Sequence, residues 1–375
     1  MSALTKFTLF ALLLVGGATI HGLSISTGYY ELIEQHKAKG VLSDGTLYNP
    51  KITGAEAVDD FLATLVQFFS PCTDGSAPGL SLQSSLFAVQ GFAFFMIWLL
   101  EGYRNGNKGK LVSFISVYGL LFQAGGLALI APAYLLLYVI TSPTVATPAP
   151  SNLAIDPAIL SGIPLAFTLG FLPPTIFMNL PSPSVISIDT KVRALALWQP
   201  VPLYVILLLR LWKLFSGSPP NSTMSKQDQL QRLRNVYKFG LAFAVPGHAA
   251  IWALSLTALV LPHIYNPSVA AEFHPLSALV PANPFAYAAT TVTSLAQGAL
   301  NFLQWDYIIS SISYLVFSLS ARFNARVEPS GFSVGDMFGL LTRICVLGPM
   351  GTALSYLWER DEIVLGRDEG QKKQR

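Results

Sequence analysis

Four ionisable side chains lie within, or at the end of, long apolar stretches of this sequence. They are Glu101, His248, Asp306 and Arg343, and the amide of Gln123 lies in another such stretch. Ionisable groups at membrane depth are costly in free energy and usually mark a function. A carboxylic acid in a medium of low dielectric constant stays neutral and can donate a proton to a reacting group. These residues therefore predict acid chemistry by isolated carboxyl groups in an apolar, aromatic-lined cavity.

Each of these residues also has a structural interpretation. Glu101 and Arg104 could form an ion pair where a helix leaves the bilayer, and Arg343 could pair with Asp306 between two helices. His248 is typical of a histidine that packs between helices. Asp306 has no obvious partner within its own helix, so a structural role explains it least well.

Motifs for several other chemistries are absent from the sequence. No DDxxD or NxxxDxxxD cluster is present to hold Mg²⁺ on a diphosphate, because Asp59 and Asp60 lack a third acid at the required spacing. The DxDD motif of soluble protonating cyclases is absent, and HExxH, GxSxG, P-loop and histidine-box arrangements do not occur in a suitable context. Cys72 and Cys345 lack metal-binding spacing. The expected chemistry is metal-independent and requires no cofactor.

The composition explains how such side chains come to be isolated. Of 375 residues, 52% are hydrophobic and 11% are charged, whereas a soluble domain has about 25% charged residues. The net charge of +3 is too small to indicate nucleic-acid binding. We expect a polytopic, all-α transmembrane bundle that forms one domain over residues 1–375.

Hydropathy predicts eight spans of about 20 residues each. They cover residues 7–23, 82–100, 111–140, 159–178, 194–215, 239–261, 302–320 and 337–358. The first is expected to be an uncleaved helix rather than a signal peptide. Residues 111–140 would extend about 45 Å and contain Gly125-Gly126 and Pro132, so they form either one long kinked helix or a helix followed by a broken one.

The polar segments connect these spans and flank them. Residues 24–81 form the largest one, and within it residues 56–69 have apolar side chains at helical spacing, which predicts an interfacial helix over the mouth of the bundle. A second short helix is expected near residues 287–300. Residues 359–375 are predicted to form a charged C-terminal tail.

The topology signals conflict with one another. The positive-inside rule makes residues 104–110 and 210–238 cytoplasmic, but eight spans put three crossings between them and so place them on opposite sides. Asn221 heads a glycosylation acceptor that is usable only in the lumen. Lys372-Lys373 resembles a dilysine signal for the endoplasmic reticulum, read on a cytoplasmic tail. The eight-span count therefore favours a cytoplasmic C-terminus and a lumenal Asn221.

Several short motifs are similar to those of fungal integral-membrane terpene cyclases of the ascochlorin and ascofuranone type. They are WLLEGYRNGN at 98–107, APAY at 131–134, residues 138–143, WQP at 198–200 and QWD at 304–306. The resemblance extends from about residue 82 to most of the remaining chain. It implies a metal-independent enzyme of meroterpenoid biosynthesis that protonates a terminal epoxide or alkene on a farnesyl chain, after which the carbocation closes rings.

The resemblance also implies roles for individual residues. Smaller membrane cyclases of related chemistry rely on an early Glu and a late Asp, which match Glu101 and Asp306. We expect Asp306 to be the general acid and Glu101 a second acid or proton relay. Residues expected to tune or orient them are Arg343, His248, Trp305, Tyr307 and Gln123. The expected partners are a lipophilic prenylated substrate and the bilayer, with no nucleic acid.

Two other classes of protein fit the same sequence. A secondary transporter or channel also uses broken helices and buried charges, although no inverted repeat is visible in the sequence. A non-enzymatic membrane scaffold would use Asp306 and Arg343 as a structural pair. The oligomeric state does not follow from the sequence.

Overall fold

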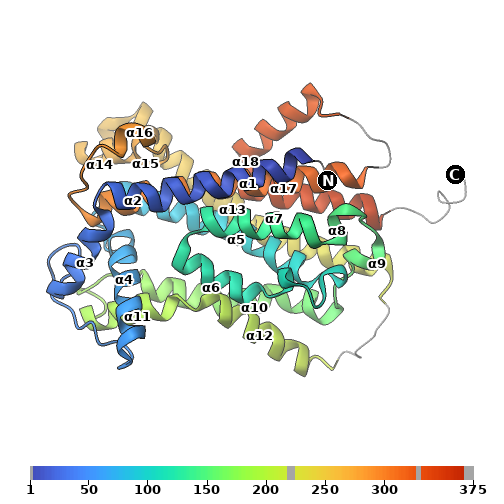
Figure 1. Cartoon of the computed structure of the whole chain (residues 1–375), viewed down its shortest axis with the longest axis horizontal. Coiled ribbons are helices and arrows are strands. Elements are labelled where there is room, and N and C mark those ends of the chain that lie inside the picture. The colour runs from blue at the N-terminus through green and yellow to red at the C-terminus, as the bar shows by residue number, and fades with distance from the viewer. Residues whose placement is uncertain (1–2, 218–223, 327–330, 367–375) are drawn as a thin grey trace, which may run out of the picture.

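The computed structural model describes residues 3–217, 224–326 and 331–366, and in this part of the chain the structure is all-α (Figure 1). The long helices are α4 (Glu56–Thr73), α5 (Pro78–Tyr103), α10 (Pro157–Met178), α13 (Lys226–Val260), α17 (Leu295–Ala325) and α18 (Val334–Leu365). Helices of intermediate length are α1 (Ala3–Gly16), α3 (Tyr29–Lys39), α6 (Ile115–Gly125), α7 (Leu127–Thr141), α11 (Ile188–Trp198) and α12 (Val201–Phe215). Short ones are η1 (Gly17–Gly22), α2 (Leu23–Ser26), η2 (Asn105–Asn107), η3 (Leu111–Ser113), α8 (Pro143–Ala146), α9 (Pro150–Leu153), η4 (Pro262–Ile264), α14 (Pro267–Phe273), α15 (Pro275–Ala278) and α16 (Pro284–Tyr287).

Fewer helices than predicted qualify as membrane spans. Within the described residues, five helical stretches are long and apolar enough to cross a membrane, and the pair α11–α12, bent by 60°, would make a sixth. The five are Ala3–Ser26, α5, Pro150–Met178, α13 and α18. The protein is therefore a multi-pass membrane protein with five or six candidate spans rather than eight.

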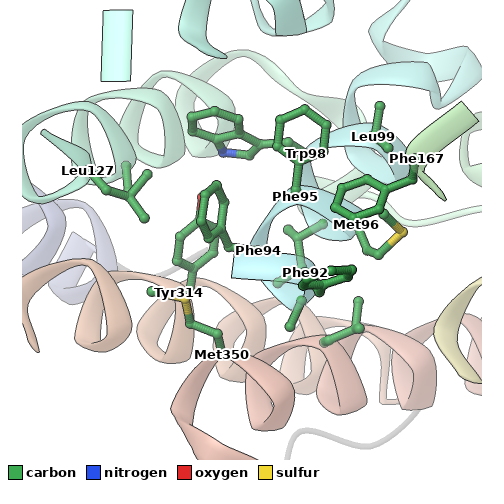
Figure 2. Close-up of a cluster of buried hydrophobic side chains, with 14 of the residues drawn as sticks. Phe92, Phe94, Phe95, Met96, Trp98, Leu99, Leu127, Phe167, Tyr314 and Met350 are labelled. Carbon is green, nitrogen blue, oxygen red and sulfur yellow. The ribbon is translucent and has the colours of Figure 1, made fainter. Parts of the chain in front are cut away.

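Helix α5 lies at the centre of the bundle. Its apolar residues occur on every face, which is typical of a helix surrounded by others. Figure 2 shows side chains of α5 among residues of four neighbouring helices. From α5 these are Phe92, Phe94, Phe95, Met96, Trp98 and Leu99, and around them lie Leu127, Phe167, Tyr314 and Met350.

Residues 111–140 form a hairpin and not a single long span. The chain reverses at Gly126, whose φ of 77° and ψ of 153° interrupt the helix; a positive φ of this kind is readily adopted only by glycine. As a result, Lys110 before α6 donates to the carbonyl of Thr141 at the end of α7 at 2.7 Å. The first and last residues of the segment therefore lie at the same end of the bundle.

Helix α18 is a second hairpin of the same kind. Gly348 has a φ of 74° and a ψ of 165°, and Pro349 follows it. Arg343 donates to the hydroxyl of Ser355 at 3.2 Å, although these residues would lie about 18 Å apart along a straight helix. The two arms, 334–347 and 349–365, therefore fold against each other. The span predicted at 337–358 is therefore broken at Gly348, and residues 359–365, which were predicted to belong to the charged tail, are helical.

One end of the bundle is organised around residues 143–156, which contain α8 and α9. Several helix termini bond to this segment at distances between 2.7 and 3.3 Å. The partners are Arg104 after α5, Lys213 near the end of α12, Gln229 at the start of α13 and Asn324 near the end of α17. We call this the basic end, because four segments that carry lysines and arginines lie there, namely residues 104–110, 210–213, 226–238 and 322–326.

The opposite end, which we call the capped end, carries α3, α4, α11 and α14 to α16 (Figure 1). The second interfacial helix expected near residues 287–300 is not one helix, because α16 ends at Tyr287 and α17 begins at Leu295. Only α10 and the pair α11–α12 run between the two basic loops, since the 111–140 segment returns to its own side. The conflict between the basic loops therefore disappears.

The fold makes a prediction about membrane orientation. The positive-inside rule places the basic end in the cytoplasm. Asn221 lies outside the described residues, but it follows Lys213 and precedes Lys226 by only a few positions. We expect Asn221 to remain unglycosylated, so that glycosidase treatment of the wild-type protein produces no gel shift.

A matched control uses the capped end. Asp44 lies in the exposed loop after α3, in the sequence Asp44-Gly45-Thr46, so that Asp44→Asn creates a glycosylation acceptor by one substitution. This variant should show a glycosidase-sensitive shift. A shift in the wild type that disappears in Asn221→Gln would contradict the orientation.

Candidate active site

An apolar cavity lies between the α6–α7 turn and the capped end. Its volume is about 220 Å³, and α3, α4, α5, α10, α11, α12 and α17 contribute to its wall. Ten aromatic side chains line it, among them Phe68, Phe94 and Trp198. Asp306 is the one carboxyl group among the lining residues that the structure describes.

Helix α4 covers the cavity at the capped end. Leu65, Phe68 and Phe69 face the cavity, whereas Val58 and Phe61 on the other side of the helix are exposed. The helix begins where Asp59 accepts hydrogen bonds from the backbone N–H groups of the preceding loop, and these bonds lower the pKa of Asp59. The sequence prediction of an amphipathic helix over residues 56–69 agrees with this arrangement, although α4 extends to Thr73.

Asp306 is held at the break between α6 and α7. Its side chain is 3% exposed, and its Oδ1 accepts a hydrogen bond from the backbone N–H of Ala128, in the first turn of α7. The first N–H groups of a helix have no partner within the helix, and a carboxyl group is a common acceptor for them. No basic side chain in the described chain forms a salt bridge with Asp306.

His21 holds the other side of the same break. It lies in the π-helical turn η1, and its Nε2 contacts the carbonyl of Gly125, the last residue of α6, at 3.0 Å. Its Nδ1 lies 2.5 Å from the hydroxyl of Tyr30, and both His21 and Tyr30 line the cavity. His21 is absent from the sequence-based candidates because it lies near the end of an apolar first helix that carries no motif.

The break in α18 has the same geometry but different chemistry. There a single amide, Gln90, makes both backbone contacts: its Nε2 donates to the carbonyl of Leu347 and its Oε1 accepts from the N–H of Met350. These positions relative to Gly348 match those of Gly125 and Ala128 relative to Gly126. A neutral amide therefore bonds to the free carbonyl and N–H at the Gly348 break. At the Gly126 break, which faces the cavity, a histidine contacts the carbonyl and an acid accepts from the N–H.

Glu101 lies elsewhere, in a buried ion network. Arg360 binds both of its carboxyl oxygens at 2.7 and 2.8 Å, and Arg104 binds one at 3.2 Å. Asp361 bonds to both arginines, and Tyr138 donates to Glu101 at 2.7 Å. The two acids balance the two arginines, and all four side chains are at most 1% exposed. The predicted pair of Glu101 with Arg104 is present.

The structure therefore does not bring Glu101 and Asp306 into one site. Glu101 is not among the cavity-lining residues. Arg360 and Asp361, which belonged to the predicted charged tail, are core residues. The early position of the glutamate in the sequence could not reveal this, because its partners lie far along the chain in α18.

The other predicted residues occupy different places. Gln123 lines the cavity and donates to the carbonyl of Gln199 at 3.1 Å. His248 contacts the carbonyl of Cys345 at 3.2 Å, in the first arm of α18. Arg343 pairs with Glu359 and not with Asp306.

The two aromatic neighbours of Asp306 both pack within the bundle. Trp305 packs partly buried beside the apolar clusters of α3 and α7, and Tyr307 contacts the ring of Phe87. Neither residue lines the cavity.

Comparison with known proteins gives a match over nearly the whole chain. A family model described as the CtvD domain matches residues 5–365. Terpene cyclase ascI of Acremonium egyptiacum is 34% identical over 374 residues, which cover 98% of this chain and 94% of that protein. Terpene cyclase ctvD of Aspergillus terreus is 28% identical over 96% of this chain and 99% of its own. No solved structure matches.

The ion network makes a prediction about stability. Glu101→Gln leaves Arg360 without a full counter-charge in a dry site, and removing one partner of a buried pair costs about 3–5 kcal/mol. We expect a marked fall in the melting temperature of the detergent-solubilised protein. Glu362→Gln is the matched control, because the pair of Glu362 with Arg234 is partly exposed and such pairs contribute about 0–1 kcal/mol. Equal stability of the two variants would argue against the network.

Proposed function

The chain belongs to the CtvD family of fungal membrane terpene cyclases, and from this premise we propose that it cyclises a farnesyl chain on a meroterpenoid precursor. The reaction begins with protonation of a terminal epoxide or alkene. Asp306 is the general acid, and the aromatic cavity is the place of ring closure. The single observation that supports this most is the isolation of one carboxyl group among ten aromatic side chains.

The cavity suits each stage of such a reaction. A prenyl chain partitions into the bilayer, so a cavity inside the bundle can take it up directly. Once Asp306 has transferred its proton, the positive charge moves along the chain as successive carbon–carbon bonds form. The negative faces of rings such as Phe68, Phe94 and Trp198 attract a cation. The apolar wall also limits the access of water to the cation.

In this proposal Glu101 has a structural role and is not an acid catalyst like Asp306. Its carboxylate is engaged by two arginines, which leaves it in the charged form that cannot donate a proton. Glu101 acts by joining α5 to the second arm of α18. Arg343 and His248 likewise act on the α18 hairpin and not on the substrate. Gln123 lines the cavity and is available to a polar group of the substrate.

A transporter for a small molecule is the alternative function. The broken hairpins at Gly126 and Gly348 are the feature that favours it, because transporters form binding sites at such breaks. Product mass separates the two functions. Cyclisation converts an epoxidised farnesyl-phenol into an isomer of the same mass, whereas transport leaves the compound unchanged.

The proposed location is the endoplasmic reticulum membrane. Its basis is the dilysine-like Lys372-Lys373, which lies outside the described residues. Co-localisation of a tagged protein with a reticulum marker tests it.

Replacement of the acid tests the proposed mechanism. In Asp306→Asn the amide oxygen can still accept the hydrogen bond from the N–H of Ala128. The backbone at the break therefore keeps its partner while the proton donor is lost. We expect turnover of the epoxidised farnesyl-phenol in microsomes to fall by about 10²-fold or more, with an unchanged melting temperature. Asp228→Asn, at an exposed helix start, is the control. Full turnover by Asp306→Asn would refute the assignment of the acid.

A further inference from the structure

Acid-initiated isomerisation needs a proton acceptor as well as a donor. The reactant and the product are both neutral and have the same composition, so each proton that the enzyme adds must leave again. We propose that His21, through the hydroxyl of Tyr30, accepts the proton that leaves the cyclised cation. This inference rests on the proposed function and assigns a second titratable group to the same cavity.

The position of the pair favours this role. His21 and Tyr30 both line the cavity that contains Asp306. Asp306 contacts the N–H of Ala128 and His21 contacts the carbonyl of Gly125, so the donor and the acceptor bond to the backbone on the two sides of Gly126. The ring of Phe302, one helical turn before Asp306, forms a T-shaped pair with the His21 ring at a centroid distance of 6.0 Å. The acid and the base therefore adjoin the same space.

The hydrogen bonds fix the tautomer of His21. A carbonyl oxygen only accepts hydrogen bonds, so the contact with Gly125 requires the proton to be on Nε2. The lone pair is then on Nδ1, where it accepts from the hydroxyl of Tyr30. Tyr30 is half-buried in α3, and burial raises its pKa. The hydroxyl therefore serves as a relay to Nδ1 and not as a phenolate base in its own right.

The proton transfer balances. A C–H or O–H bond of the cyclised cation breaks and its electron pair stays with the product as a double bond or a lone pair. The proton forms a new O–H bond at Tyr30 while the original hydroxyl proton moves to Nδ1 of His21. The charges then are one negative carboxylate, Asp306, and one positive imidazolium, His21. Return of the proton from His21 to Asp306 restores both groups, and no other reactant is consumed.

The break at Gly348 shows that hydrogen bonding to the free backbone groups of such a break does not by itself require an acid and a histidine. Gln90 satisfies the equivalent carbonyl and N–H with a neutral amide. At the Gly126 break the same two contacts are divided between an acid and a base. His21 also lies in a π-helical turn, a distortion that occurs frequently at functional sites.

Two substitutions test the proposal without removing the structural contact. His21→Gln retains a donor for the carbonyl of Gly125 but has no basic nitrogen, and Tyr30→Phe removes only the relay hydroxyl. Controls of the same type lie outside the cavity. They are His36→Gln and Tyr204→Phe. In the wild type the imidazole of His36 contacts the carbonyl of Leu42, and the hydroxyl of Tyr204 donates to the carbonyl of Leu197.

The readout is the product mixture formed by microsomes from an epoxidised farnesyl-phenol, with melting temperatures measured in parallel. If His21 is the acceptor, both substitutions lower the rate of isomer formation by about 10²-fold. They also shift the products toward compounds that are one water heavier, because the cation persists until water captures it. The controls retain the wild-type rate and products.

Three results would overturn the proposal. One is an unchanged rate and product mixture in both His21→Gln and Tyr30→Phe. Another is slower turnover with an unchanged product mixture, which indicates a structural effect only. If His21→Gln fails to fold, Tyr30→Phe alone decides between these outcomes. The third is the absence of any isomer from the wild type, which refutes the proposed function itself and so is distinguished from the other two.

Discussion

The structure depends on how the protein satisfies the backbone where it breaks a helix inside the bilayer. Hydrocarbon offers no hydrogen bonds, so every N–H and C=O freed by a break needs a partner within the protein. Gly126 and Gly348 each open such a break, because their positive φ values reverse the chain. Gln90 supplies both partners at one break, and His21 with Asp306 supplies them at the other. The acid is thereby placed at the inner tip of a hairpin.

The breaks are kept in place by charges at the basic end. Glu101 and Arg104 at the end of α5 bond to Arg360 and Asp361 in the returning arm of α18. Tyr138 in the returning arm of α7 donates to Glu101, so both hairpins are fixed to α5 through one network. Such a network is stable in a dry interior only when all its charges are paired. The paired charges of the network therefore hold the helices of the bundle together, whereas Asp306, which forms no salt bridge among the described residues, faces the cavity.

The sequence alone predicts a large part of this structure. Scarce charge and long apolar stretches predict an all-α membrane bundle, and the isolation of Asp306 in such a stretch identifies the candidate acid. The amphipathic pattern around Phe68 and Phe69 predicts the helix over the cavity. Hydropathy fails at the hairpins, because it records how apolar a segment is and not whether the chain reverses within it. Gly125-Gly126 and Gly348-Pro349 were the local signals of reversal.

Long-range pairing accounts for the remaining differences. Arg360 and Asp361 look like a solvated tail, since a charged run near a terminus is normally exposed, and only the folded chain brings Glu101 to them. His21 is a single ionisable residue near the end of an apolar helix, and its importance follows from the approach of α6 and α3.

The most direct test of the account is to locate the reacting end of the substrate. A farnesyl-phenol with a photoreactive diazirine at its terminal isoprene unit would be bound to the protein in microsomes and irradiated, and the labelled peptides would be identified by mass spectrometry. The account predicts labels on Phe302 to Asp306 and on the turn at 122–126. Labels concentrated around Glu101, Tyr138 and Arg360 would contradict it.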